Sequence, residues 1–82
     1  MKTIVEVLRY RNLSSGYSRL VDRPVRIACC LTLDQLQETS GGGFVDSLPA
    51  SYEQRLPAGF RRWRNGSGTY MAVREVEDTG PG

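Results

Sequence analysis

The chain has 82 residues, of which 39% are hydrophobic and 24% charged, and its formal net charge is +2. These proportions are typical of an ordinary folded domain and exclude a wholly disordered chain. A chain this short can bury only roughly 60% of its unfolded surface, so it has room for a single small core. We expect one globular domain over residues 1–76 and a flexible acidic tail over residues 77–82, where glycine and proline accompany the carboxylates.

No apolar run approaches the roughly 18 residues that a membrane-spanning helix needs. The carboxylate of Glu6 also interrupts the start of the chain, where a signal peptide requires uninterrupted apolar residues. We therefore expect a cytoplasmic protein with no membrane partner.

The two cysteines, Cys29 and Cys30, are adjacent in an apparent strand. Successive strand residues point to opposite faces, so these side chains cannot easily bond to each other. The chain has no histidine and no third cysteine to complete a metal site. We interpret them as two small, buried or half-buried side chains, and expect no metal and no cofactor.

Charge is unevenly distributed along the chain. Basic residues dominate residues 1–31 and 55–74, whereas acidic residues dominate residues 32–54 and 75–82. Lys2 is the one lysine among the eleven lysines and arginines. Arginine suits an interface or a phosphate contact, because its flat guanidinium forms paired hydrogen bonds and stacks on aromatic rings. Codon bias in a GC-rich genome gives the same ratio, so the clustering carries more weight than the ratio.

The first half of the chain predicts extended structure. Residues 3–11 are rich in β-forming side chains, with apolar groups on both faces, which favours an interior strand or one covered by a helix. After a turn over residues 12–16, a second extended region spans residues 17–31 and is interrupted over residues 22–24, which end in a proline. Beyond this break, alternation places one set of side chains in the core: Val25, Ile27, Cys29 and Leu31.

A short helix is predicted next. Thr32 and Gln35 have the spacing of a capping box, and Asp34 lies in the first turn, where the helix dipole favours an anion. The helix should end near Glu38 or Thr39, before the glycines at 41–43. We interpret these glycines as a flexible connection, because phosphate loops place glycines before a helix and usually supply a lysine.

Residues 44–57 carry weaker signals than the hairpin that follows. Phe44 and Val45 suit a short strand or a plug into the core, and residues 50–56 a turn or two of helix. Residues 60–76 then predict a hairpin around the polar loop at 65–68. The expected class is α+β: a small antiparallel sheet of about four strands with one or two short helices, in the order β-β-α-(α)-β-β.

The predicted hairpin holds the strongest candidate for a binding surface. Alternation places Arg61 and Trp63 on one face and Arg62 and Arg64 on the other. Arginine and aromatic side chains are enriched at protein-binding hot spots and also contact nucleic acids. An alternative interpretation makes Trp63 a core anchor and the arginines its solvated rim. The candidate binding residues are Arg61, Arg62, Trp63, Arg64, Tyr70 and Arg74, extended by Arg9, Arg11 and Arg26.

Catalytic signals are weak. The commonest general base, histidine, is absent, and no serine or cysteine has an activating partner at a recognisable spacing. Asp34 and Glu38, one helical turn apart, are better explained as solvated helix residues than as metal ligands. A ribonuclease using Arg62, Tyr70 and Glu75 is chemically conceivable, but their spacing supports no such site. We therefore expect no catalytic residues.

These observations favour a non-enzymatic binding protein. It would be an inhibitor or accessory subunit that engages a larger protein or nucleoprotein complex, of the kind that phages and other mobile elements use against host machinery. Direct binding of single-stranded nucleic acid on the sheet face is the first alternative. A small ribonuclease-type toxin is the second.

Overall fold

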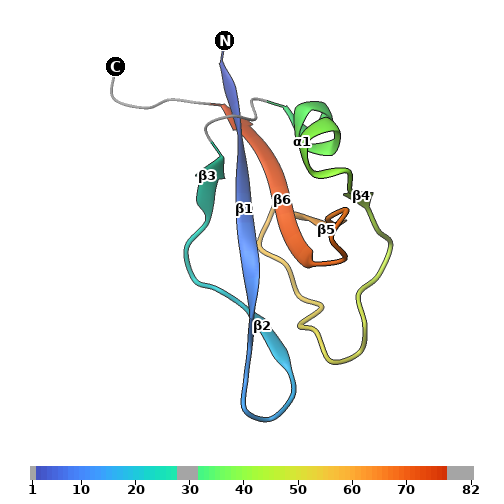
Figure 1. The fold of residues 1–82 in the computed structure, drawn as a ribbon. Helices are drawn as coiled ribbons and strands as arrows, with labels where there is room; N and C mark the ends of the chain where they lie inside the picture. The colour runs from blue at the N-terminus through green and yellow to red at the C-terminus, as the bar shows by residue number, and fades with distance from the viewer. Residues whose placement is uncertain (1, 28–31, 78–82) are drawn as a thin grey trace.

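The computed structural model describes residues 2–27 and 32–77. Within them, six strands form one sheet and a single helix packs on it (Figure 1). The elements are β1 (Thr3–Asn12), β2 (Ser18–Leu20), β3 (Val25–Ile27), α1 (Leu33–Ser40), β4 (Gly43–Phe44), β5 (Arg61–Arg64) and β6 (Tyr70–Glu77). The α+β class is confirmed, but the sheet has more strands than the four expected, because β3 and the two-residue β4 add short edge strands.

Strand β1 is the centre of the sheet. The strand order is β2-β1-β6-β5-β4, with β3 also pairing β1, and every strand pairing is antiparallel. One edge of β1 pairs with β6, and the other pairs first with β3 and then with β2. All five residues from Ile4 to Leu8 are buried, which confirms the prediction of an interior strand with both faces covered.

Helix α1 covers one face of the sheet. Its Leu36 joins a core cluster with side chains from three strands: Val5, Val7, Trp63, Met71 and Val73. The predicted capping box is present, since Thr32 Oγ1 accepts from the Gln35 backbone N–H at 3.2 Å and Gln35 Oε1 accepts from the Thr32 backbone N–H at 3.2 Å. Gly41 ends the helix at φ 72°, a conformation that glycine adopts without strain.

The glycine run after the helix packs closely against the backbone of the β5–β6 loop, so the prediction of a flexible connection is wrong. A side chain at Gly42 would collide with the backbone carbonyl of Arg64. The Gly66 backbone N–H donates to the Ser40 carbonyl at 3.0 Å. The glycines are needed here because two backbones approach each other where the helix passes the β5–β6 loop.

The long connection over residues 45–60 covers the opposite face. Phe60 packs with Leu8 and Ala72, and Leu56 lies against them. The helix predicted over residues 50–56 does not form, because the backbone pairs with β2 instead. The Ser18 N–H donates to Ser51 O at 2.8 Å, and the Glu53 N–H donates to Ser18 O at 2.8 Å. A segment bonded to β2 in this way cannot form the local hydrogen bonds of a helix.

Strand β3 corrects part of the predicted core. Ile27 packs against the helix-side cluster, but Val25 is 54% exposed because it lies on a short strand at the sheet edge. Cys29, Cys30 and Leu31 lie outside the described residues. At the other end of the chain β6 continues to Glu77, one residue past the expected domain boundary, and residues 78–82 also lie outside them.

No helix in the described part of the chain is long and apolar enough to cross a membrane.

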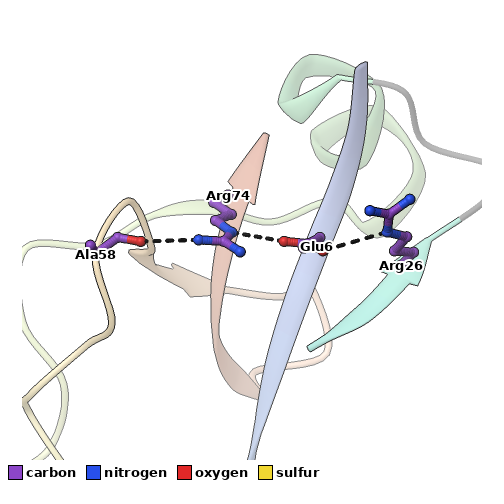
Figure 2. A network of polar contacts seen from close by, with 4 residues as sticks. All are labelled: Glu6, Arg26, Ala58 and Arg74. Carbon is purple, nitrogen blue, oxygen red and sulfur yellow. Dashed lines mark hydrogen bonds and ion pairs between the residues drawn. The ribbon is translucent and has the colours of Figure 1, made fainter. Parts of the chain in front are cut away.

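Among the residues that the structure describes, the most buried charged one is Glu6, which is 7% exposed in the middle of β1. Arg74 on β6 and Arg26 on β3 lie directly opposite it on either side. Figure 2 shows the network: Arg74 Nε donates to Glu6 Oε1 at 2.8 Å, and Arg26 Nε lies 3.5 Å from Glu6 Oε2. Arg74 also donates to the Ala58 carbonyl at 3.2 Å and stacks on Phe60, 4.5 Å from its centroid.

We predict that Glu6→Gln lowers the free energy of unfolding by about 2 kcal/mol, because it removes the charge that two arginines share in a largely buried position. Denaturant unfolding measures the change. Glu77→Gln is the matched control, since it removes an exposed carboxylate at the end of β6 and should change stability by about 0.5 kcal/mol or less. Equal effects of the two substitutions would contradict a structural role for the Glu6 network.

Candidate binding surfaces

The nine predicted binding residues do not form one surface. They are distributed over both faces of the sheet and over several strands. Arg26 and Arg74 hold the Glu6 carboxylate and so serve the fold. Whether any of the nine contacts a partner stays a prediction, but their positions separate those that support the structure from those that are displayed.

Trp63 has the role of core anchor that was the alternative interpretation of the sequence. Its side chain is 1% exposed and lies in the cluster under α1. Phe44, directly opposite it on β4, meets its ring edge-on with centroids 4.9 Å apart. In this position Trp63 cannot stack on a ligand itself, but it supports the exposed ring beside it.

Phe44 and Arg61 lie on the same face of the sheet at the β4–β5 edge, and Arg64 is displayed from the opposite face of β5. We call these three residues the edge patch. Phe44 is 42% exposed, and the guanidinium carbon of Arg61 lies 3.7 Å from its ring centroid. Among the described residues, no carboxylate lies within ion-pair distance of Arg61 or Arg64. The sequence identified both arginines. It missed Phe44 as a binding residue, because its position in the sequence is equally consistent with a side chain buried in the core.

Two shallow hollows flank Phe44. One, of about 240 Å³, is lined by Arg61, Arg62 and Asp46 among others. The second, of about 260 Å³, is lined by Arg64 and by the backbone of the glycine run. The edge patch is therefore an aromatic ridge between two polar hollows, each with an arginine at its side.

Arg62 lies on the opposite face from Trp63, as the alternation predicted. Its Nη2 donates to the Gln54 carbonyl at 3.1 Å, which fastens the long connection to β5. The side chain is half-buried. The Arg62 side chain is therefore less accessible to a partner than the exposed side chains of Arg61 and Arg64.

Tyr70 belongs to a row of three tyrosines whose middle member, Tyr52, comes from the same connection. Tyr52 meets Tyr10 and Tyr70 edge-on, at centroid distances of 5.0 and 5.2 Å. The Tyr10 hydroxyl donates to the Glu53 carbonyl at 2.9 Å. Burial raises the pKa of Tyr10 to about 12, helped by the Glu53 carboxylate and opposed by Arg62.

Arg9 and Arg11 are exposed on β1, and the register places Arg19 of β2 directly opposite Arg11. We call these three residues the arginine face. The sequence identified two of them and missed Arg19, which only the pairing of β1 with β2 brings to the others. The position of the turn could have identified Arg19, because a hairpin centred on residues 13–17 pairs residue 11 with residue 19.

The three residues considered for ribonuclease chemistry do not converge. Arg62 and Tyr70 share the face covered by the long connection, since Arg62 lies opposite Ala72. Glu75 alternates to the other face, where its carboxylate accepts from the Leu33 N–H at 3.4 Å. No group of three potential metal ligands occurs among the residues that the structure describes.

Comparison with protein-family models, with curated proteins and with solved structures found no match.

We predict that Tyr10 ionises near pH 12. Its folded pKa lies above the value of about 10 in an unfolded chain, so the neutral hydroxyl stabilises the fold below about pH 10 and this contribution is lost between about pH 10 and 12. Tyrosinate absorbance and denaturant unfolding measure both effects. Over that range the wild type should lose stability more steeply than Tyr10→Phe; equal slopes would refute the assignment. Tyr17→Phe, at an exposed position, is the control and should keep the steep loss.

We also predict that Trp63 fluorescence is protected. Because the ring is 1% exposed, acrylamide should quench the native emission several-fold less than that of the same protein in denaturant. Added oligonucleotide should not quench it directly. Quenching of the native protein as strong as that in denaturant would show that the ring is accessible in solution.

Proposed function

We propose that the protein is a non-catalytic binding protein, an inhibitor or accessory subunit, that engages a larger protein or nucleoprotein complex through the edge patch. The observation that carries this proposal is the exposed Phe44 ring, held between Trp63 and the Arg61 guanidinium. A large apolar side chain fixed in this way is already ordered before binding, so little conformational entropy is lost when a partner covers it.

The composition of the edge patch supports a protein contact. Interfaces are enriched in aromatic residues and arginine. Arg61 stacks on the Phe44 ring, and Arg64 lines one of the hollows beside it from the other face of β5. Their guanidiniums can receive carboxylates or carbonyls of a partner without first breaking an ion pair within the described residues. The adjoining hollows can accept side chains that surround the central ring.

The separation of Arg62 and Tyr70 from Glu75 leaves the ribonuclease alternative without a shared site. Binding requires no such convergence, and the edge patch needs only the residues that the sheet already brings together. A binding role is therefore the function that the geometry supports best.

The test begins with capture of the partner from the source organism and measurement of its affinity in purified form. Phe44→Ala should weaken the complex at least tenfold, which corresponds to about 1.4 kcal/mol. The double variant Arg61→Glu, Arg64→Glu should weaken it further through charge reversal. Because all three side chains are exposed, the thermal transition should change little.

Val25→Ala is the matched control, since it removes an exposed apolar side chain on β3, which pairs with β1 and lies outside both surfaces. It should leave the affinity for the protein partner unchanged. A partner that binds Phe44→Ala and the double arginine variant as tightly as it binds the wild type would overturn the proposal.

A further inference from the structure

The arginine face displays three like charges together. Arg9 and Arg11 are two residues apart on β1 and therefore point to the same side of the sheet, and Arg19 lies directly opposite Arg11 on β2. All three side chains are exposed, and none of the guanidiniums has a hydrogen bond or an ion pair within the described residues. The face lies towards the β1–β2 loop, at the end of the sheet away from α1 (Figure 1).

The arginine face differs from the Glu6 network in how its charges are balanced. There, arginines on two strands flank a carboxylate on the strand between them. Arg11 and Arg19 are direct cross-strand neighbours with no carboxylate between them, although like charges in this position destabilise a sheet. A bound anion at the arginine face would relieve this repulsion.

The surroundings of Arg19 indicate which anion. Tyr17, two residues before it, is 60% exposed, and both line a groove of about 470 Å³ together with Leu13 and Tyr52. A groove with accessible aromatic and apolar side chains beside a guanidinium suits a flat base attached to a phosphate. Proteins that bind single strands combine these two elements, a basic track for the backbone and rings on which bases stack.

The spacing of the charges favours a chain of phosphates over a single anion. Arg9 and Arg11 are separated by two strand residues, a distance of about 6.6 Å along β1. Glu53 also lines the groove, but its carboxylate accepts from the Leu20 backbone N–H at 3.0 Å and forms no ion pair with Arg19. Asp22 and Arg19 both line a second hollow, and Asp22 also forms no ion pair with Arg19.

We propose that the arginine face binds single-stranded nucleic acid, with the sugar–phosphate backbone along Arg9, Arg11 and Arg19 and a base stacked on Tyr17. This site is distinct from the edge patch, which takes the protein partner. An accessory subunit of a nucleoprotein complex would use both. Contacts to phosphates and to the flat face of a base carry little sequence information, so binding is tolerant of sequence.

The experiment measures fluorescence anisotropy of a labelled mixed-sequence DNA single strand of about 12 nucleotides, and of the same sequence as RNA, from about 50 mM salt upward. Both should bind, with affinity falling as salt rises. The double variant Arg11→Gln, Arg19→Gln should lose at least tenfold in affinity at low salt. It should also reduce the slope of log affinity against log salt by about 1.4, because each phosphate contact contributes about 0.7.

Lys2→Gln, Arg23→Gln is the matched control, because it removes the same charge from two exposed positions outside both surfaces. It should retain most of the affinity and of the salt slope. Tyr17→Ala should weaken binding while leaving the slope unchanged, which separates stacking from charge. Removing the opposed arginines should not lower the thermal midpoint, so loss of binding in that variant cannot be attributed to unfolding.

Three outcomes overturn the proposal: no binding by the wild type at low salt, equal losses in the two double variants, or equally tight binding of poly-glutamate. The last would show a site for acidic peptides. The outcome is independent of the edge patch, since Phe44→Ala should bind the oligonucleotide like the wild type. If the oligonucleotide does not bind, the proposed protein contact is therefore unaffected, because the edge-patch variants test it separately.

Discussion

The structure depends on the burial of one carboxylate. Glu6 lies in the middle of the central strand, where both faces of the sheet are covered, and a charge in that position is costly unless cations reach it. Arg74 and Arg26 supply them from the strands on either side. The same pairings align β6 and β3 with β1, and Arg74 continues to the long connection through Ala58 and Phe60. Ion pairing, strand register and the covering of the second face are thus linked.

This constraint sorts the arginines by role. Arg26 and Arg74 are committed to Glu6, and Arg62 fastens the long connection. Five of the exposed arginines fall into two groups, the edge patch on β5 and the arginine face on β1 and β2, while Arg23 and Arg55 are exposed outside both. Because β6 lies between β1 and β5, the two groups are separate surfaces. Because they are separate, we propose a different ligand for each, a protein at the edge patch and a single strand of nucleic acid at the arginine face.

Aromatic side chains divide in a similar way. Trp63 is enclosed by α1 and the strands, and Tyr10 and Tyr70 pack against Tyr52 of the long connection, whereas Phe44 and Tyr17 are exposed. Each exposed ring is close to an arginine, Phe44 to Arg61 and Tyr17 to Arg19. Each displayed surface therefore combines charge with a ring, and the charge is not balanced by a carboxylate among the described residues.

Local interactions were readable from the sequence alone. The structure contains four features that the sequence predicted from residues close together in the chain. They are the capping box at Thr32, the break before Val25, the interior position of β1 and the hairpin around residues 65–68. Only the tertiary structure decided what depends on distant partners. Residues 50–56 pair with β2 and do not form a helix, Arg74 meets Glu6, and Arg19 comes to lie opposite Arg11. The physical reason is that side-chain alternation fixes which face a residue occupies, whereas strand register and the covering layer decide whether that face is buried, paired or displayed.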